Sequence, residues 1–319
     1  MRNKNDKDSK ILVVGAGTMG PGIAQVFATG GYMTILTDIK KEALEMAKQK
    51  IQSNLETLIA AGEISKEDAD VCWNNIAFTL WPLQKNPDAD FVLEAVPEIP
   101  DLKAQVFKEL DDLCRDETIL SSTTSALNIF ELVKVSNPER LIITHFCNPP
   151  HIIPLVEIVL GPKTSFETLE KVKGILKSCG KIPVVIKQYI PGFLVNRLNA
   201  ALIREAAYIV SKGWADWEDV DMAFKLNAGL KAPFEGPLES VDYMGWDVAM
   251  FAGMFLLPHL CNATSIEFAE EMVSKGLLGV KSGGGLRDYT GKSRLEIEKN
   301  RSLKILKILK AARELERIR

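Results

Sequence analysis

The sequence predicts an α/β domain built on a mostly parallel sheet, followed by an all-α domain. Over the first 188 residues, short apolar runs alternate with helical patterns, which is typical of parallel strands joined by crossover helices. A glycine-rich turn directly follows the first apolar run. After residue 188 the strand patterns stop, and helical spacing continues to the end. We therefore expect one domain over residues 1–188 and a second over residues 189–319.

The composition is that of a globular protein in aqueous solution. The 319 residues are 46% hydrophobic and 25% charged, with a formal net charge of −3, so no basic surface for nucleic acid is expected. No apolar run reaches the roughly 18 residues of a membrane span, and the first nine residues, interpreted as a disordered leader, contain no signal core. Five scattered cysteines and three histidines give little material for a metal site. We expect a cytoplasmic protein without a metal.

The first strand and the turn after it carry a dinucleotide-binding pattern. The strand is expected over residues 10–14, and the turn reads Gly15-Ala16-Gly17-Thr18-Met19-Gly20 before a helix. The next strand, residues 34–37, ends at Asp38, about 20 residues past the glycines. Gly15 permits a tight turn, Gly17 lets the backbone approach a pyrophosphate, and Gly20 lets the helix pack closely. Because the Asp38 carboxylate would bind ribose hydroxyls and repel a 2′-phosphate, a Rossmann-like domain that binds NAD is predicted.

The remaining elements of the first domain follow from apolar spacing and end signals. Helices are expected over residues 40–61, 65–74, 100–114, 129–135 and 164–178, and strands over residues 76–80, 91–94, 118–121, 141–143 and 182–186. Ligands of an open parallel sheet bind beyond the carboxyl ends of its strands. Glu98 and Lys103 follow one such end, and Ser125 lies in a hydroxyl-rich loop after the next. By themselves, these residues are more typical of a solvated helix start and of a capping loop.

A histidine and a carboxylate accompany two apolar runs between residues 141 and 157. The first run leads to His145, two adjacent prolines stiffen the loop, and the second run ends on Glu157. Histidine can take and return a proton near neutral pH, and a carboxylate can orient it. These residues alone leave two interpretations equally open: a catalytic pair, or a structural histidine with a surface glutamate.

Helical patterns dominate the second domain. Pro191 suits a helix start, and the long apolar helix after it contains Asn196, whose side chain needs a hydrogen-bond partner. A glycine-rich turn over residues 279–285 carries Lys281. Residues 291–319 are predicted to form an amphipathic helix that packs on a domain or on a partner subunit.

Together these motifs resemble the L-3-hydroxyacyl-CoA dehydrogenase family along nearly the whole chain. The matching segments are residues 15–20, 94–98, 121–126, 191–197, 236–237 and 279–285, with Asp38, His145-x-x-Asn148-Pro149 and Glu157 between them. The resemblance implies a Rossmann-like domain followed by an all-α domain that dimerises. It also implies active-site roles for His145 as base, Glu157 as its partner, Ser125 as the hydroxyl on the substrate oxygen, and Asn196. Cofactor contacts are implied at Gly15, Gly17, Thr18, Met19, Gly20, Asp38, Glu98, Lys103, Asn148 and Lys281, which replaces the solvated-helix interpretation of Glu98 and Lys103.

The chain departs from this family where coenzyme A would be bound. Family members carry lysines on the helix pair after the second strand, whereas this chain carries Glu56, Glu63, Glu67, Asp68 and Asp70, with Lys66 nearly alone. Carboxylates repel phosphate groups. The loop 148–154 resembles the branch that holds lambda-crystallin (an L-gulonate dehydrogenase), carnitine dehydrogenase and a pyridine-carboxylate dehydrogenase, which act on free hydroxy acids or alcohols. In that loop, His151 would either contact a substrate carboxylate or lie in solvent, the second being the commoner case.

The sequence thus predicts an NAD-dependent dehydrogenase that oxidises a 3-hydroxy acid or a related alcohol. His145 would take the hydroxyl proton while NAD takes the hydride. A true 3-hydroxyacyl-CoA dehydrogenase is the nearest alternative, and a non-catalytic, crystallin-like NAD-binding protein is the alternative of another class. The 6-phosphogluconate-type dehydrogenases share the glycine turn but require a lysine that residues 191–196 lack. The expected partners are a small-molecule substrate and a second copy of the chain.

Overall fold

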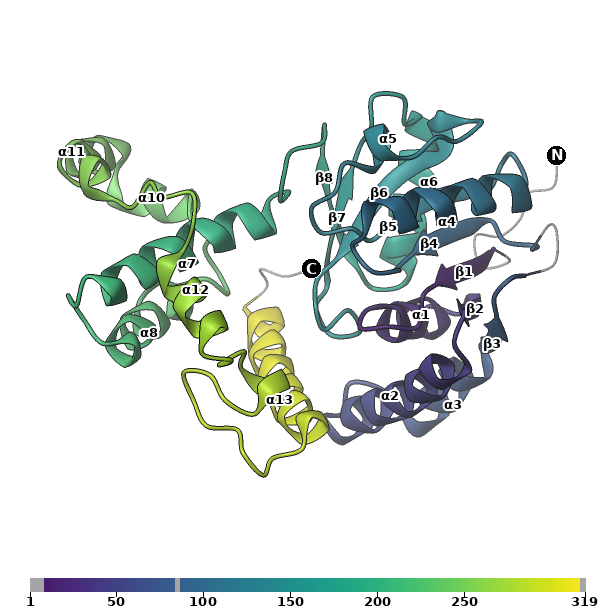
Figure 1. Cartoon of the computed structure of the whole chain (residues 1–319), viewed down its shortest axis with the longest axis horizontal. Coiled ribbons are helices and arrows are strands. Elements are labelled where there is room, and N and C mark those ends of the chain that lie inside the picture. The colour runs from purple at the N-terminus through teal and green to yellow at the C-terminus, as the bar shows by residue number, and fades with distance from the viewer. Residues whose placement is uncertain (1–8, 84–86, 316–319) are drawn as a thin grey trace. The chain divides into compact units, whose positions relative to one another are not determined.

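The computed structural model describes residues 9–83 and 87–315 (Figure 1). It divides into two compact units, Met1–Asn196 and Arg197–Arg319. The predicted leader lies almost entirely outside the described residues, as does the end of the last predicted helix. The sequence pattern changes at residue 188, yet the first unit continues to Asn196 because the segment 189–196 hydrogen-bonds back to it. Tyr189, for example, donates its hydroxyl to the Ala126 carbonyl at 2.7 Å.

The first unit is built on an eight-stranded sheet of order β3-β2-β1-β4-β5-β6-β7-β8. All neighbouring strands run parallel except β6 and β7, which are antiparallel. Because the strand order reverses between β1 and β4, a crevice forms at their carboxyl ends. The predicted mostly parallel sheet is therefore confirmed. The strands are β1 (Lys10–Val14), β2 (Met33–Asp38), β3 (Ile76–Leu80), β4 (Phe91–Glu94), β5 (Ile119–Ser122), β6 (Leu141–Phe146), β7 (Leu155–Val159) and β8 (Ile182–Ile186).

Helices cover both faces of this sheet (Figure 1). They are α1 (Gly20–Thr29), α2 (Lys41–Ala60), α3 (Lys66–Asn74), α4 (Pro100–Leu113), α5 (Ile129–Leu132) and α6 (Phe166–Ser178), with a 3-10 turn η2 (Pro138–Arg140). Successive side chains of a strand point to opposite faces. In β1, Ile11 and Val13 join the core under α1, α2, α3 and α6, while Leu12 and Val14 join the core under α4 and α5. This double burial explains why the strands read as continuous apolar runs.

Several helix ends follow from local signals in the sequence. Ser65 accepts the backbone N–H of Asp68 while the Asp68 carboxylate accepts the N–H of Ser65, a complete capping box at α3. The start predicted for the long helix near Pro191 is wrong, since α7 (Val195–Ser211) begins four residues later. The reason is backbone conformation: Gly192 and Phe193 have φ of 76° and 52°, in the left-handed region where a helix cannot run.

The second unit is helical, which confirms the predicted all-α region. It contains most of α7 and then α8 (Trp217–Leu226), α9 (Ala228–Lys231), α10 (Glu239–Met244), α11 (Trp246–Leu256), α12 (Glu267–Ser274) and α13 (Arg294–Glu314), with 3-10 turns η3 (Leu257–His259) and η4 (Val280–Ser282). The turn 279–285 is tied by isolated bridges, one of which joins Gly279 to Gly284. Among the described residues, no helix has the length and apolar character needed to cross a bilayer.

Candidate functional site

A cavity of about 680 Å³ lies in the first unit, where β1 and β4 end. Its walls come from the glycine turn after β1, the residues after β2 and β4, Trp81 after β3, and one face of α4. Gly15, Gly17, Thr18, Met19 and Asp38, five of the predicted cofactor residues, line it. The cavity therefore sits at the crevice where a doubly wound sheet binds its ligand.

The three glycines of the turn fit a dinucleotide for different reasons. Gly15 has φ of +108°, and a Cβ there would lie 2.7 Å from the carbonyl oxygen of Ala95. A Cβ on Gly20 would lie 1.8 Å from the oxygen of Gly15, so only glycine permits this approach of helix and strand. A Cβ on Gly17 meets no atom within 4 Å, because Gly17 faces the open cavity. The backbone is thus bare where a pyrophosphate would pass, next to the free N–H groups of α1.

Asp38 ends β2 and is fixed by two backbone amides. Its Oδ2 accepts the N–H of Ala16 at 2.8 Å, and its Oδ1 accepts the N–H of Lys40 at 2.9 Å. An ionised carboxylate has about four acceptor positions, so both oxygens can still accept from ribose hydroxyls. The carboxylate lines the cavity beside the glycine turn, which suits the adenosine ribose of NAD.

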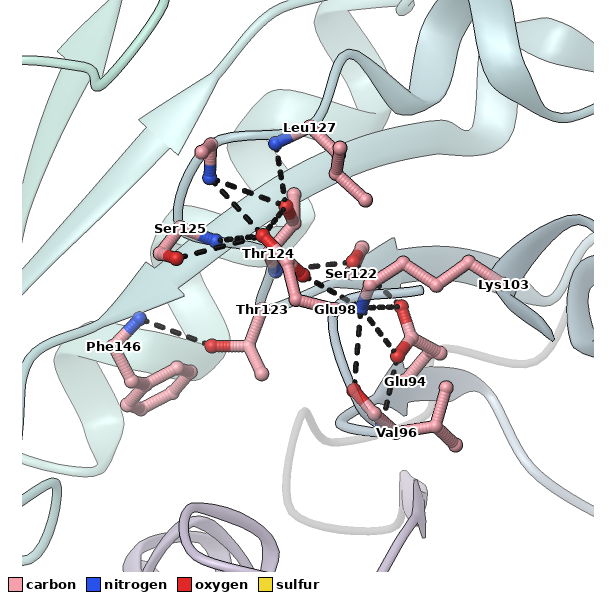
Figure 2. A network of polar contacts seen from close by, with 11 residues as sticks. Glu94, Val96, Glu98, Lys103, Ser122, Thr123, Thr124, Ser125, Leu127 and Phe146 are labelled. Atoms are coloured by element: carbon pink, nitrogen blue, oxygen red, sulfur yellow. Dashed lines mark hydrogen bonds and ion pairs between the residues drawn. The ribbon is translucent and has the colours of Figure 1, made fainter. Parts of the chain in front are cut away.

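A buried ion pair stands behind the next strand end (Figure 2). Glu94 is 0% exposed and Lys103 1%, and the lysine Nζ lies 2.7 and 3.0 Å from the two carboxylate oxygens. Glu94 also accepts the Ser122 hydroxyl at 2.6 Å and the Val96 N–H at 2.7 Å. The interpretation of Lys103 as a solvated helix residue is wrong, because its amine neutralises a carboxylate that has no access to water.

Glu98 links this pair to the hydroxyl-rich loop after β5 (Figure 2). One oxygen lies 3.2 Å from Lys103 Nζ, and the other accepts the Thr124 hydroxyl at 2.5 Å and the Ser125 N–H at 2.9 Å. Burial alone would raise the pKa of Glu98, but these hydrogen bonds and the Lys103 charge outweigh it and lower that pKa. Glu98 thereby holds the loop, while Ser125 stays exposed with its hydroxyl only weakly engaged, 3.4 Å from Glu98.

His145 and Glu157 stand directly opposite each other on the antiparallel strands β6 and β7. Cross-strand partners project to the same face of a sheet, and here His145 Nδ1 lies 2.6 Å from Glu157 Oε2. Glu157 lies in the middle of β7, so the expectation that it ends its strand is wrong. The alternative of a surface glutamate is also wrong, since Glu157 is 0% exposed. The ring of Phe193 packs on the imidazole, with centroids 5.4 Å apart.

The second oxygen of Glu157 is occupied by the turn that starts α7. Oε1 accepts the backbone N–H groups of Leu194 and Val195 at 2.8 and 3.0 Å. Burial by itself would raise the pKa of Glu157, but the hydrogen bonds from His145, Val195 and Leu194 and the His145 charge together lower it. The left-handed φ of Phe193 turns the chain so that the two amides, one just before the helix and one at its first residue, face the carboxylate.

The other predicted residues fall into three groups. Asn196 finds the partner that its position requires, donating to the Ser125 carbonyl at 3.1 Å, so it joins the loop of Ser125 to the start of α7. Asn148 is exposed in the loop after β6, and with Glu98 and Lys103 it lies outside the cavity lining. Lys281 belongs to η4 in the second unit, and its predicted cofactor contact stays a prediction.

His151 does not lie in solvent, the commoner of the two roles considered for it. The ring is largely buried beside Gly22 in the first turn of α1, where Nδ1 has no partner among the described residues. Burial, followed by the nearby charges of Lys181 and Lys50, lowers the pKa of His151 to about 3, so the ring is neutral at physiological pH. A neutral ring offers a substrate carboxylate no positive charge, so the proposed contact stays a prediction and would rest on an N–H donor alone.

A nucleotide crevice on a doubly wound sheet, together with a histidine paired with a buried carboxylate on the same sheet, is the arrangement of an NAD-binding oxidoreductase. Comparison with known proteins gives the family. The model of the NAD binding domain of 3-hydroxyacyl-CoA dehydrogenase matches residues 10–189, and the model of the C-terminal domain of that enzyme matches residues 192–289. The chain belongs to the 3-hydroxyacyl-CoA dehydrogenase family, and its cofactor is NAD.

Individual relatives differ in the substrates that their names carry. A 5-formyl-3-hydroxy-2-methylpyridine 4-carboxylate 5-dehydrogenase of Mesorhizobium japonicum is 35% identical over 93% of this chain and 96% of its own. A probable 3-hydroxybutyryl-CoA dehydrogenase of Bacillus subtilis is 35% identical over 89% and 98%. Among solved structures, a dehydrogenase of the same pyridine carboxylate, described as an NAD+-dependent dismutase, has a TM-score of 0.87 at 32% identity, covering 96% and 99% of the two chains. The (S)-3-hydroxybutyryl-CoA dehydrogenase of Ralstonia eutropha has a TM-score of 0.72 at 32% identity, covering 89% and 99%.

Sequence reasoning missed three residues of this site: Glu94, Phe193 and Trp81. Glu94 could have been predicted, because it ends a strand nine positions before Lys103 and the two lie on neighbouring elements of one crossover. No local signal marks Phe193, whose left-handed φ is set by its packing between His145 and Tyr189. Trp81 follows an ordinary short strand and gains meaning only from the cavity that it faces.

Proposed function

We propose that the protein oxidises the hydroxyl of a free hydroxy acid or a related alcohol, with His145 as the base and hydride transfer to NAD. The observation that carries the proposal is the buried pair of His145 and Glu157, whose second carboxylate oxygen is bound by two backbone amides. Such an arrangement suits the repeated uptake and release of a proton by an oriented imidazole.

Proton movement follows from the hydrogen bonds. Because Glu157 is ionised and accepts only, His145 Nδ1 must donate to it, which leaves the lone pair of Nε2 to accept a proton. The O–H proton of the substrate moves to Nε2, and Glu157 stabilises the imidazolium that results. Ser125, exposed on a loop fixed by Glu98, would hold the substrate oxygen by its hydroxyl. When bound, NAD supplies the acceptor for the hydride that leaves the carbinol carbon.

Two observations favour a free acid over an acyl-CoA thioester. The surface of α3 carries the exposed carboxylates of Glu67, Asp68 and Asp70 against one lysine, Lys66, and this acidic excess would repel the phosphates of coenzyme A. The TM-score to the pyridine-carboxylate dehydrogenase is 0.87, against 0.72 for the hydroxybutyryl-CoA enzyme. A true 3-hydroxyacyl-CoA dehydrogenase remains the second candidate because several relatives carry that name.

A substrate panel followed by NADH absorbance tests the proposal. It contains the hydroxymethyl and formyl forms of a 3-hydroxypyridine carboxylate, L-gulonate, carnitine, 3-hydroxybutyrate and 3-hydroxybutyryl-CoA. We expect kcat/KM for at least one free acid to exceed that for the thioester by tenfold or more; the reverse order would reject the substrate class. His145→Ala should lose turnover and still bind NAD, and retained turnover would reject the dehydrogenase itself. NAD binding without turnover of any compound would favour the crystallin-like alternative.

We also propose that two copies of the chain assemble through the helical unit. Helix α11 is apolar nearly all round, yet Phe251, Met254 and Phe255 are 64–67% exposed in the single chain. A helix of this composition is normally buried, so a second copy is the simplest cover. Light scattering after size exclusion should give twice the mass of the chain, and Phe251→Glu should lower it. A wild-type monomer would contradict this assembly.

A further inference from the structure

One wall of the cavity is a tryptophan that lies outside the segments on which the family resemblance was recognised. Trp81 follows β3 directly, and its backbone N–H donates to the carbonyl of Asp38 at 3.0 Å. This bond extends the pairing of β2 with β3 by one residue beyond Leu80. The tryptophan is therefore fixed next to Asp38, the carboxylate suited to the adenosine ribose, and both residues line the same cavity.

The indole is also held from the opposite wall. Its Nε1–H donates to Glu109 Oε2 at 2.9 Å, and the other oxygen of Glu109 accepts from Gln105 Nε2 at 2.9 Å. Glu109 and Gln105 lie on α4 and face the cavity as well. The indole is thus attached to the chain just after β3 and hydrogen-bonded to α4 through its Nε1, which limits its rotation. A flat side chain restrained in this way is preorganised for a flat ligand.

Aliphatic side chains share this lining with the indole. They are Ile39, Val96, Leu102 and Val106. An apolar slot with one aromatic wall suits a neutral heteroaromatic ring, and of the parts of NAD beyond the ribose at Asp38 only adenine is one. Bases stack on aromatic side chains because every base has a π face. We propose that Trp81, clamped by Glu109, is the stacking wall for the adenine of NAD and a main determinant of affinity for the adenosine half of the cofactor.

A purely structural Trp81 would behave differently. The indole also packs on the core under α4, so it contributes to the attachment of β3. If that were its whole role, substitutions would change stability and leave nucleotide affinity alone. If the indole stacks on adenine, affinity depends on aromaticity: Trp81→Phe keeps a ring, whereas Trp81→Leu keeps apolar bulk without a π face.

The test uses ADP-ribose, which contains the adenosine diphosphate half of NAD and undergoes no hydride transfer. Calorimetry on the full chain should show the Kd for ADP-ribose rising at least about fivefold for Trp81→Leu, the change that corresponds to roughly 1 kcal/mol of stacking. Trp81→Phe should lose clearly less affinity. Glu109→Leu, which frees the indole, should fall between Trp81→Leu and the wild type.

Fluorescence gives a second readout on folded protein. The chain has five tryptophans, and stacking on adenine should quench the emission of one of them when ADP-ribose is added. Trp81→Phe should abolish the quench, whereas Trp73→Phe, the control on α3, should keep it. A quench that persists in Trp81→Phe, or a folded Trp81→Leu whose Kd stays within twofold of the wild type, would overturn the proposal. Should Trp81→Leu fail to fold, the quench in Trp81→Phe decides. Because ADP-ribose binding is measured without turnover, failure here would leave the proposed dehydrogenase reaction untouched.

Discussion

Replacing Glu157 by glutamine tests the catalytic pair most directly, because the change keeps the shape and turns one acceptor oxygen of the carboxylate into a donor NH2 group. Two backbone amides, those of Leu194 and Val195, point at Oε1. In Glu157→Gln the amide oxygen must take this place, which turns the NH2 group toward His145 Nδ1. The ring nitrogen then has to accept, so the proton moves to Nε2 and the lone pair that receives the substrate proton is lost.

The structure sets the size of this effect. To restore the active tautomer, the amide would have to flip and place its NH2 against two N–H groups. Leaving two buried donors without acceptors costs about 2–6 kcal/mol in total. Since 1.4 kcal/mol is a factor of ten, the active tautomer becomes rarer by roughly 30-fold to 10⁴-fold, and kcat falls in proportion. NAD affinity should stay unchanged, because Glu157 does not line the cofactor cavity.

The assay combines kcat for the best substrate of the panel, Kd for NAD by calorimetry, and ¹⁵N NMR of labelled histidine. Only three histidines are present, so the tautomer of His145 can be assigned directly. Glu167→Gln, an exposed glutamate on α6, is the matched control and should leave all three readouts as in the wild type. A Glu157→Gln enzyme with kcat within threefold of the wild type, or with the proton still on Nδ1, would refute the reasoning.

Four further predictions concern single sites. The Cβ of Gly17→Ala meets no protein atom, so Tm should stay within about 2 °C while calorimetry shows at least about tenfold weaker NAD binding. Unchanged binding would contradict the close approach of the pyrophosphate to the backbone of Gly17. Phe193→Gly keeps a positive φ at no strain, so urea unfolding should find it about 1 kcal/mol more stable than Phe193→Ala, and the opposite order would argue against backbone strain. Lys103→Met leaves Glu94 as a lone buried charge and should cost about 3–5 kcal/mol of unfolding free energy, most of it recovered when Glu94→Gln is added; a change below about 1 kcal/mol would mean that Glu94 is hydrated. The pKa of His151 is held at about 3, so between pH 6.5 and pH 3 the unfolded chain binds a proton that the folded chain does not, and the free energy of unfolding decreases as the pH is lowered. From pH 7 to 5 the wild type should lose about 2 kcal/mol more than His151→Asn. Equal losses would contradict the burial of the ring.

The nucleotide half of the site was largely readable from the sequence, because each of its requirements is local. The strand, the glycine turn, the helix and Asp38 lie within 29 consecutive residues, and the structure brings Gly15, Gly17 and Asp38 to one cavity. The order of strands and helices was equally readable, since apolar periodicity depends on neighbours only a few positions apart. The local pattern also predicted the start of α3 at Ser65, which the structure shows to be its cap.

Other predictions failed where a distant segment decides the environment. Lys103 looks solvated in its own helix and becomes buried because Glu94 lies on the adjacent strand. Pro191 suits a helix start, yet α7 begins only at Val195, since Phe193 packs against the ring of His145. His151 lies in a loop and is of a residue type that is usually exposed there, yet the first turn of α1 covers it. In each case the partner is far away in sequence or in another element.

The sequence by itself determined the two-part architecture, the NAD crevice and the position of His145 at a strand end, because these depend on residue types and spacing along a few turns of chain. Only the tertiary structure decided what stands against that histidine. The antiparallel register of β6 and β7 sets Glu157 opposite His145, and the amides that fix its second oxygen come from 37 and 38 residues further on. A register and a return path are set by the packing of the whole core, where a shift of one residue would turn the carboxylate to the other face of the sheet.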